Sequence, residues 1–508
     1  MSATDVRATA ILRGVQGPQV AAFFDFDGTL IDGFSATAFL RGAAIPWPRL
    51  ARAALGRGPL PLARLLAGQL TREPSDRDIR FAHEVADRAG QGVSEDERAA
   101  LAARVFAERL APRLRPEAWA LVQAHRRAGH RVAVVTAARR WQVEPLAAAL
   151  GISDLLCSPS AAEPLRGEAK AVAVLDYALR HGIELAESHA YGDAGDDVPF
   201  LEVCGHPCAV APRTALARTA AERGWPILHP DPRPGLDPLA AARSLAAWSG
   251  TAAGVGTALG LAAAGLDRRE AAEFGMALAS RACLELAGVQ VSVYGYEYLC
   301  TRPAVYLFNH QSWLDVAVMA RLLRRDYTGF AKHELERLPG LAGFGRMFEV
   351  VFIDRTATAS ASDFFRPVLD LLGRGISVAV APEGTRSLTP TPGPFHKGAF
   401  LAARKAKVPV VPVVIRNSGR LMPRGAKTVR PGRVDVILHP PLDPAAWPLS
   451  ELTPRLAALA DLYLSTLTTG AAQPTRPSTS AAPARHPGVG HPGSLTAGAP
   501  GPTRPSAR

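Results

Sequence analysis

The stretch Ala21-Ala22-Phe23-Phe24-Asp25-Phe26-Asp27-Gly28-Thr29-Leu30 decides the fold of the first half of the chain. Four apolar residues run directly into two acids, a pattern that indicates a buried strand ending at a polar turn. Asp25 and Asp27 are two residues apart, so along a strand their side chains point to the same side. Gly28 permits a tight turn after them, and Thr29 adds a hydroxyl. Two carboxylates at the end of a strand are therefore the first candidate site.

Two further apolar runs place this strand in a sheet. Residues 130–136 (HRVAVVT) and 189–193 (HAYGD) have the same form, and helical patterns lie between the strands. This alternation predicts an α/β fold with a Rossmann-like parallel sheet. We assign residues 20–243 to this domain and residues 1–19 to an N-terminal extension. Residues 34–112 are rich in Ala, Leu and Arg and have no strand-like run, which predicts a helical cap over the sheet.

Polar residues also follow the other predicted strands. Thr136 ends one strand, Asp193 and Asp197 follow another, and Lys170 opens a helical stretch. One carboxylate can attack phosphorus while a second protonates the leaving oxygen and later activates water. Hydroxyl and ammonium groups can hold phosphate oxygens, and Mg²⁺ would hold together carboxylates that otherwise repel each other. Lys170 is informative because Lys supplies only 6 of the 58 basic residues.

These elements, in this order, resemble the motifs of the haloacid dehalogenase superfamily of phosphohydrolases, and most of all its phosphoserine-phosphatase-like branch. The resemblance covers about residues 20 to 230. It implies that Asp25 is the nucleophile and Asp27 the general acid/base, and that Thr136 and Lys170 bind phosphate. The Mg²⁺ ligands that it implies are Asp25, the Asp27 carbonyl, Asp193 and, as a supporting acid, Asp197. The determinants of serine phosphate in the cap are not recognisable, so the substrate stays open.

A second constellation begins after the apolar run of residues 303–308 (PAVYLF). The segment Asn309-His310-Gln311-Ser312-Trp313-Leu314-Asp315 follows that run. His310 could take a proton from an attacking hydroxyl, and Asp315, about one helical turn on, could hold the other ring nitrogen. Alone, this spacing also fits a helix start in which polar side chains cap backbone N–H groups. The downstream sequence has to decide between the two.

Further candidates follow downstream. Lys332 is another rare Lys and precedes a helical stretch, one strand ends at Arg355, and another ends at a turn with Glu383, Gly384, Thr385 and Arg386. Guanidinium groups at strand ends suit an acceptor that carries a phosphate. Residues 408–413 (VPVVPV) also have a strand-like pattern, but their two prolines predict an edge or substrate-wall segment rather than a central strand. We assign residues 295–468 to a second α/β domain.

The blocks NHQSWLD, FIDR, PEGTRS and VPVVPV resemble, in kind and order, those of the glycerolipid acyltransferases, specifically the 1-acyl-glycerol-3-phosphate acyltransferases. The resemblance covers about residues 295 to 440. It implies His310 as the base, Asp315 as its partner, and lysophosphatidate (1-acyl-sn-glycerol 3-phosphate) as the acceptor. The donor would be a thioester of CoA or of acyl carrier protein. The pocket around the acceptor phosphate would contain Lys332, Arg355, Glu383, Gly384, Thr385 and Arg386.

Residues 244–294 lie between the two domains. The stretch 245–266 has no charged residue over 22 positions, which is long enough to span a bilayer, but most of it is Ala and Gly. Residues 271–293 are more amphipathic. Three interpretations stay open: a spanning helix, an interfacial or re-entrant hairpin, and a soluble pair of interdomain helices. The acyltransferase resemblance favours membrane association, because that family commonly approaches the membrane through an N-terminal helical pair.

The composition and net charge limit the classes of binding partner. The hydrophobic fraction of 48% excludes wholesale disorder, and 58 basic against 46 acidic residues give a net charge of +12. This balance favours nucleic acid, anionic lipid or phosphorylated substrates. We find no nucleic-acid-binding motif, and we expect no nucleic-acid partner. Residues 469–508 are rich in Pro, Gly, Ala, Ser and Thr and contain no acid, which predicts a disordered tail.

Together these features predict a bifunctional enzyme of phospholipid biosynthesis. One domain would be a Mg²⁺-dependent phosphatase of unknown phosphomonoester substrate, and the other would acylate lysophosphatidate to phosphatidate. We expect the chain at the cytoplasmic face of the cell membrane. The alternative is that one of the two domains is inactive and serves as a scaffold or lipid sensor.

Overall fold

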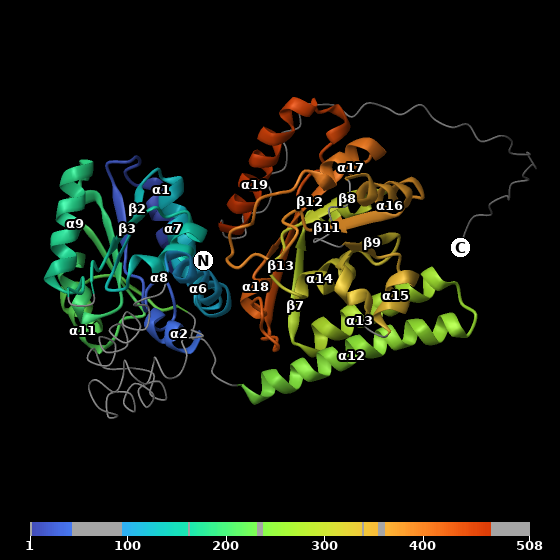
Figure 1. Cartoon of the computed structure of the whole chain (residues 1–508), viewed down its shortest axis with the longest axis horizontal. Helices are drawn as coiled ribbons and strands as arrows, with labels where there is room; N and C mark the ends of the chain where they lie inside the picture. Colours follow the sequence, from blue (N-terminus) through green and yellow to red (C-terminus); the bar gives the residue numbers. More distant parts are fainter. Residues whose placement is uncertain are drawn as a thin grey trace, which may run out of the picture. The chain divides into compact units, whose positions relative to one another are not determined.

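The computed structural model of the protein describes residues 3–42, 94–160, 163–230, 237–337, 340–353 and 361–468. Within them lie two separate sheets, each covered by its own helices (Figure 1). The α/β fold predicted from the sequence is confirmed for both halves of the chain. Most of the predicted cap, Arg355 and the predicted disordered tail lie outside the described residues.

The first sheet has six strands in the order β3-β2-β1-β4-β5-β6, and every pair is parallel. The strand predicted at the opening stretch is therefore central, with a neighbour on each side. The strands are β1 (Ala21–Phe24), β2 (Arg131–Thr136), β3 (Asp154–Cys157), β4 (His189–Gly192), β5 (His206–Val210) and β6 (Ile227–Leu228).

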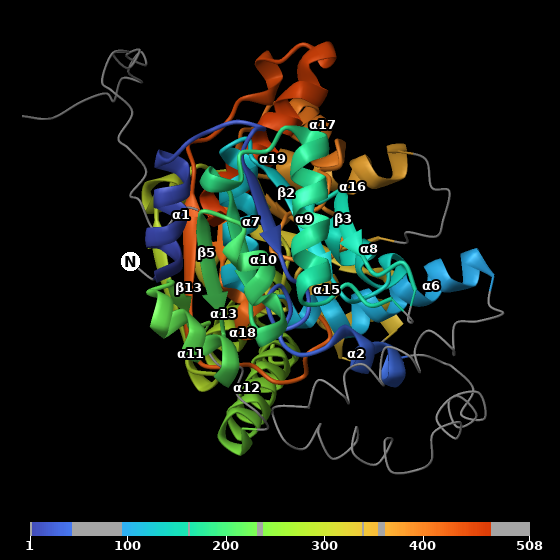
Figure 2. The same ribbon diagram turned by 90° about the vertical axis from the view of Figure 1, so that its left-hand side faces the viewer.

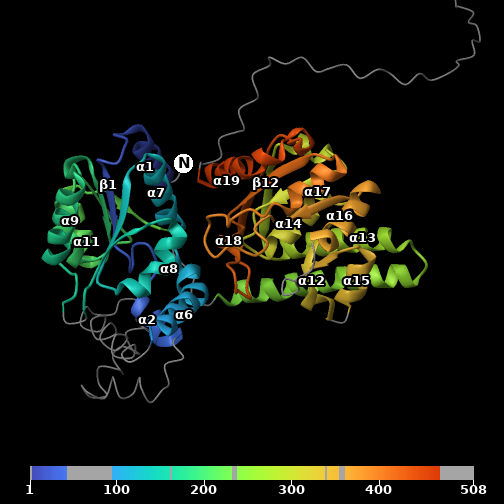
Figure 3. The same cartoon turned by 45° about the horizontal axis from the view of Figure 1, so that its top comes forward.

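Alternate residues of β1 pack on opposite faces of this sheet. Phe23 lies edge-on to Tyr177 of α9, whereas Phe24 stacks on Tyr191 and meets His125 of α7. Figure 2 looks onto the face covered by α9, α10 and α11, and Figure 3 shows β1 between that layer and α7 with α8. Both faces are thus buried, which explains why β1 is apolar at every position.

The helices of the first half connect these strands and begin the predicted cap. The predicted N-terminal extension contains α1, whose Ile11 is buried in the same cluster as α7. The helices are α1 (Ala3–Arg13), α2 (Ser35–Gly42), α6 (Glu95–Val105), α7 (Pro116–Arg127), α8 (Arg140–Leu150), α9 (Glu168–His181), α10 (Val198–Glu202) and α11 (Thr214–Arg223), with single turns η1 (Phe106–Leu110), η2 (Ala111–Arg113), η3 (Leu185–Glu187) and η4 (Gly195–Asp197).

The second sheet has seven strands in the order β10-β9-β11-β8-β12-β13-β7. All its pairs are parallel except β12 with β13. The strands are β7 (Val289–Tyr294), β8 (Val305–Phe308), β9 (Tyr327–Lys332), β10 (Val351–Ile353), β11 (Ser377–Val380), β12 (Val410–Arg416) and β13 (Gly432–Leu438).

The prediction that residues 408–413 form an edge or wall segment is wrong. β12 lies between β8 and β13, and its residues are buried from Val410 to Ile415. Pro409 precedes the strand, and its carbonyl accepts a hydrogen bond from Val305. Pro412 lies opposite the end of β13, where its carbonyl accepts from the backbone N–H of His439 at 2.9 Å. The carbonyl groups of both prolines still accept hydrogen bonds from neighbouring strands, and only their backbone N–H groups are missing. An interior strand therefore tolerates them.

Two helix layers cover the second sheet. One contains α16, α17 and α19, and the hydroxyl of Tyr463 in α19 donates to the Leu307 carbonyl at 2.6 Å. The other contains α12, α13, α14 and α15. The helices are α12 (Pro238–Ala263), α13 (Arg268–Leu286), α14 (Leu314–Leu323), α15 (Leu341–Met347), α16 (Ala361–Gly373), α17 (Gly398–Ala406), α18 (Ser418–Leu421) and α19 (Leu452–Thr468), with turns η5 (Tyr296–Cys300), η6 (His333–Arg337), η7 (Pro444–Ala446) and η8 (Leu449–Glu451).

The segment between the two predicted domains forms a helical pair, α12 and α13, that lie side by side (Figures 1 and 3). Small residues allow the close approach: a Cβ at Gly254 would lie 2.6 Å from the backbone nitrogen of Ala279. Ala272 and Leu284 of α13 join the apolar cluster of the second sheet. Among the described residues, α12 is the helix long and apolar enough to cross a membrane, a weak indication by length and composition alone.

Candidate functional sites

The predicted residues of the first site meet at the carboxyl ends of parallel strands. Asp25 follows β1, Thr136 ends β2, and Asp193 follows β4. Lys170 lies in the first turn of α9, and Asp197 ends η4. All five line one small cavity. The parallel topology brings them together, because neighbouring parallel strands end at the same edge of the sheet.

Lys170 joins two of the acids. Its Nζ donates to Oδ1 of Asp25 and to Oδ1 of Asp197, each at 2.6 Å, and all three side chains are buried. Burial alone would lower the pKa of Lys170, but the two carboxylates outweigh it and raise that pKa. The lysine therefore stays charged and holds both acids in fixed positions.

Asp197 is also fixed on its other side. Its Oδ2 accepts from the backbone N–H groups of Asp193 and Ala194, both at 3.0 Å. A Cβ at Gly192 would lie 2.6 Å from the Asp197 Cβ, so a larger residue there would displace the carboxylate. Both oxygens of Asp197 accept hydrogen bonds, which makes it a support for the Asp193 loop as well as an acid of the cavity.

Asp27 is held by the start of α2. Its two oxygens accept from the backbone N–H of Ser35 at 2.6 Å and from the Ser35 hydroxyl at 2.9 Å. Burial raises the pKa of Asp27 to about 6, although the bonds from Ser35 lower it in part. Gly28 beside it has φ +87°, and a Cβ there would lie 2.1 Å from Oδ2 of Asp193. Only glycine at this turn leaves room for Asp193.

The acids fit a hard divalent cation. Oxygens of Asp25, Asp193 and Asp197 lie within 4.8 Å of one another. Burial raises the pKa of Asp25 to about 7 and that of Asp193 well above its usual range, with neighbouring acids adding to both. Lys170 and Arg213, whose Nε lies 3.3 Å from Oδ2 of Asp193, offset part of this charge. Carboxylate oxygens are the ligands that Mg²⁺ prefers, so the donor set suits it.

Sequence reasoning missed three residues of this site. Ser35 positions Asp27, Arg213 pairs with Asp193, and Arg166 forms a 2.8 Å ion pair with Asp196 at the cavity. Arg213 follows β5 at the same edge of the sheet, so extending the rule of strand ends to the fifth strand would have found it. Ser35 and Arg166 carry no such signal, because Ser35 begins α2 and Arg166 lies in the loop before α9, neither directly after a strand.

In the second half, His310 and Asp315 form a hydrogen-bonded pair after β8. Nδ1 of His310 lies 2.9 Å from Oδ2 of Asp315, which also accepts from the N–H groups of Gln311 and Ser312 at 2.8 Å. Asp315 is fully buried, whereas the His310 side chain is 19% exposed. An ionised carboxylate can only accept, so Nδ1 carries the hydrogen and Nε2 keeps its lone pair. That nitrogen can take a proton from a hydroxyl.

Glu383 supports the histidine through its backbone. Its Oε1 accepts from the N–H of His310 at 3.0 Å, and its Oε2 accepts from the Ser387 hydroxyl. The N–H of Ser387 donates to the His310 carbonyl at 2.7 Å, which closes a small network. Burial raises the pKa of Glu383 to about 7. Gly384 has φ +69°, a left-handed conformation that favours glycine in this turn.

The predicted cations are placed differently from one another. The Arg386 guanidinium lies over the Trp313 ring at 5.0 Å, and burial together with Arg424 lowers its pKa. Lys332 ends β9 at the same edge as His310, with β11 between them, and is exposed. Arg355 lies outside the described residues. Thr385 is exposed beside Arg386.

Sequence reasoning missed supporting residues here as well. Trp313 holds Arg386, Ser387 holds Glu383, and Arg424 donates to the Arg386 carbonyl at 2.7 Å. Trp313 and Ser387 stand inside the quoted motifs, but nothing in the spacing distinguished them from their neighbours. Arg424 comes from the loop after α18 and has no motif around it.

Comparisons with known proteins agree with this geometry. The sequence model of haloacid dehalogenase-like hydrolases matches residues 22–202, and that of the acyltransferase family matches residues 290–416. Phosphoserine phosphatase SerB1 of Mycobacterium tuberculosis is 32% identical over 218 residues, which are 41% of this chain and 70% of that protein. The first half of the chain thus belongs to the haloacid dehalogenase-like hydrolases, and residues 290–416 of the second half match the acyltransferase family model.

The acyltransferase half of the chain aligns with part of the length of its relatives. A chloroplastic 1-acyl-sn-glycerol-3-phosphate acyltransferase of Brassica napus is 38% identical over 141 residues, which are 28% of this chain and 41% of that protein. The chain therefore spans less than half the length of the acyltransferase relatives it matches first. The crystal structure of the 1-acyl-sn-glycerophosphate acyltransferase PlsC of Thermotoga maritima is 25% identical, with a TM-score of 0.40 over 46% of this chain and 97% of that one.

Proposed function

We propose that the chain is a bifunctional enzyme of phospholipid synthesis. Its C-terminal half acylates 1-acyl-sn-glycerol 3-phosphate to phosphatidate, and its N-terminal half is a phosphatase that forms an aspartyl phosphate. The observation that carries the acyltransferase assignment is the 2.9 Å contact between His310 and Asp315 at the end of β8. The phosphatase assignment rests on Lys170 and the acids around it.

The acyl-transfer step needs one base. Nε2 of His310 removes the proton from the sn-2 hydroxyl as its oxygen attacks the thioester carbonyl. The C–O bond forms, the C–S bond breaks, and the imidazolium returns its proton to the departing thiolate. Asp315 stabilises the imidazolium. Acyl-CoA and acyl carrier protein both supply such a thioester.

The acceptor phosphate would be held by cations. Arg386 has the fork geometry that suits a phosphate, and Lys332 and Arg355 would add charge. Glu383, Gly384 and Thr385 would shape this turn. Trp313 restrains the Arg386 guanidinium from one face, so less freedom is lost when phosphate binds.

The phosphatase half would act in two steps. A carboxylate oxygen of Asp25 attacks phosphorus while Asp27 gives its proton to the leaving alcohol oxygen. Asp27 then removes a proton from water, which attacks the aspartyl phosphate and releases inorganic phosphate. Thr136 and Lys170 would hold the phosphate oxygens.

Asp25, the Asp27 carbonyl, Asp193 and Asp197 would hold Mg²⁺. The ion supplies charge neutralisation for the phosphate and the acids when it is bound. Both oxygens of Asp197 already accept hydrogen bonds from Lys170 and the loop, so Asp197 would contribute mainly by orienting Asp193. The phosphomonoester substrate is left open, because no described cap residue identifies it.

The helical pair would bring the acyltransferase to its lipid substrate. Several large apolar side chains on α12 and α13 are exposed, among them Leu245 at 69% and Phe274 at 57%. Together they would insert into the interface of the membrane's cytoplasmic face. Flotation of the full chain with vesicles of anionic and of zwitterionic lipid tests this: a Leu245→Glu, Phe274→Glu variant that floats like wild type would contradict it.

The decisive experiment uses the full chain and two assays. Acyl transfer from acyl-CoA or acyl carrier protein to lysophosphatidate is measured beside hydrolysis of a panel of lipid and soluble phosphate esters. If either activity is absent under all conditions while its matched active-site variant behaves identically, that half is not the enzyme proposed.

A further inference from the structure

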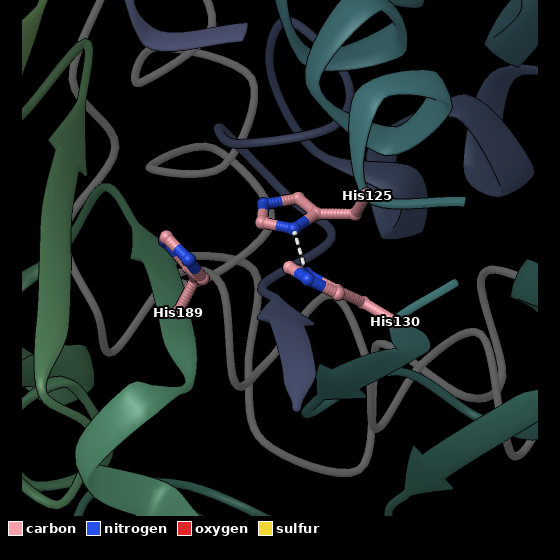
Figure 4. A group of neighbouring side chains, drawn as sticks. All are labelled: His125, His130 and His189. Carbon is pink, nitrogen blue, oxygen red and sulfur yellow. Dashed lines mark hydrogen bonds between the residues drawn. The ribbon is translucent and has the colours of Figure 1, made fainter. Parts of the chain in front are cut away.

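Three histidines meet at the other edge of the first sheet. His125 lies in the last turn of α7, His130 in the turn before β2, and His189 at the start of β4. One ring nitrogen of each lies within 4.8 Å of those of the other two. Figure 4 shows the three imidazoles gathered from a helix end and two strands. The chain spacing of 5 and 59 residues gives no motif, so only the fold brings them together.

Two of these rings are oriented by polar partners. Nε2 of His130 lies 2.7 Å from the Val15 carbonyl, which can only accept, so this nitrogen carries the hydrogen. Nδ1 of the neutral His130 ring then has a lone pair, and it faces Nδ1 of His125 at 2.9 Å. Nε2 of His125 lies 2.8 Å from the Tyr191 hydroxyl, which accepts from Nε of Arg7 at 3.4 Å and can donate its own hydrogen to His125. Nδ1 of His125 then donates to Nδ1 of His130, and in the other tautomer of His125, with Tyr191 as acceptor, both Nδ1 atoms have lone pairs that a cation can bind.

His189 supplies the observation that the hydrogen bonds leave unexplained. Its Nδ1 is buried and has no hydrogen-bond partner among the described residues. A buried polar atom without a partner costs about 1–3 kcal/mol, and a ligand that binds its lone pair removes this cost. A cation held by the three rings would bind one nitrogen of His189, and Nδ1 is available for this role.

The surroundings keep the rings unprotonated. Burial lowers the pKa of His125 and His130, and burial with His206 and Arg7 nearby lowers the pKa of His189 to about 3. Neutral imidazole is the form that binds metal, so these groups are ready as ligands at neutral pH. The donors are nitrogens, in contrast to the oxygens of Asp25 and its neighbours.

We propose that His125, His130 and His189 bind one divalent transition-metal ion of the Zn²⁺ class and so tie α7 to β2 and β4. Imidazole nitrogens suit Zn²⁺, Co²⁺ or Ni²⁺, whereas Mg²⁺ prefers oxygen. At Zn–N distances of about 2.0–2.1 Å, tetrahedral ligand nitrogens lie roughly 3.3 Å apart. The 2.9 Å contact and the 4.8 Å limit bracket that separation.

This site is independent of the proposed phosphatase chemistry. His189 begins β4 and Asp193 follows it, which separates the two along an extended strand by about 13 Å. A cation at the histidines therefore contacts none of the acids at the carboxyl edge, and the two sites differ in the metals that they select.

The test is metal binding by the full chain without an affinity tag. The protein is stripped with a chelator, saturated with Mg²⁺ to fill oxygen sites, and titrated with Zn²⁺ and with Co²⁺. We expect one ion per chain in wild type, and at least 100-fold weaker binding in His125→Gln and in His189→Gln. His206→Gln is the matched control, because its exposed ring stacks on His189 at 4.6 Å but lies outside the trio.

Wild type alone provides a second readout if a variant fails to fold. X-ray absorption at the zinc edge should give a shell of imidazole nitrogens. An ion bound only through oxygens, the absence of stoichiometric uptake in the presence of Mg²⁺, or equal affinity in folded His125→Gln and His189→Gln would each overturn the proposal.

Discussion

The two candidate active sites occupy equivalent places in their sheets but differ in charge. Asp25, Asp193, Asp197 and Lys170 are all at most 5% exposed, so four ionisable groups share a buried cavity. The acyl-transfer site has two buried acids, Asp315 and Glu383, beside an imidazole that is partly exposed. The first site therefore suits a divalent cation beside Lys170, whereas the second presents a lone pair on a histidine.

This difference explains how one chain can hold two unrelated chemistries. Parallel strands place the side chains that follow them at one edge of the sheet, and the chemistry of that edge depends on which side chains these are. A cluster of carboxylates suits phosphorus and a metal. A histidine oriented by a buried carboxylate suits proton removal from a hydroxyl. A substitution in one site should accordingly lower the activity of that site and leave the activity of the other unchanged.

The largest expected effect is that of Asp25→Asn on the phosphatase. The amide keeps the shape but is not a nucleophile, so phosphate-ester hydrolysis should fall on the order of 10⁴-fold or more. Acyl transfer measured on the same preparation should be unchanged. Hydrolysis at the wild-type rate would show that Asp25 is not the nucleophile.

His310→Ala should produce the converse result. Loss of the base should lower acyl transfer by about 10² to 10⁴-fold, while hydrolysis of the phosphate ester continues. His333→Ala, which removes an imidazole outside the pair, serves as the control in the same thioester assay. A His310→Ala protein that folds and retains full acyl transfer would remove this residue from the mechanism.

Chelation should separate the two sites without any mutation. Because the acids of the first site need a counter-cation, metal removal should lower phosphatase activity at least about tenfold, and Mg²⁺ should restore it. Acyl transfer has no such requirement and should persist in the chelated protein. If chelation lowered both activities equally, the two sites would not differ in their need for a metal ion.

The smallest effect concerns stability and pH at the second site. Burial raises the pKa of Glu383 to about 7, from a usual value of 4.5. A raised folded-state pKa means that Glu383 favours folding below pH 4.5, and this contribution is lost as the pH rises to about 7. The Gln side chain of Glu383→Gln stays neutral. Between pH 4.5 and about 7, the free energy of unfolding of the variant should therefore rise by up to about 3 kcal/mol relative to that of wild type.

Unfolding of the acyltransferase half as a function of pH, followed for wild type and Glu383→Gln, measures this difference. The two stability curves should be closest near pH 4 and diverge towards pH 7. Parallel curves over this range would show that Glu383 does not titrate with a raised pKa.

Much of both sites was predictable from local sequence. Asp25, Thr136 and Asp193 stand where an apolar run ends, and His310 stands in the same place in the second half. An apolar run of strand length predicts a buried strand, and parallel strands share an edge. The sequence could therefore assign these residues to one edge without knowing the order of the strands.

The order of the strands could not be obtained in this way. The two prolines of β12 predicted an edge strand, yet β12 is interior, because the missing N–H of Pro412 falls at the end of its partner strand. That position depends on the register with β13, and the local sequence of β12 does not contain it.

The sequence by itself determined the chemistry available to this protein: an aspartate pair and a histidine–aspartate motif that each follow a strand, and a scarce lysine that opens a helix. Only the tertiary structure decided which side chains interact. Ser35 donates to Asp27, Arg213 forms an ion pair with Asp193, and Trp313 stacks on Arg386. The tertiary structure also gathered three histidines with no common motif. The physical reason is that spacing along a strand fixes the side and the edge to which a residue points, whereas contacts between distant segments depend on how the whole chain packs.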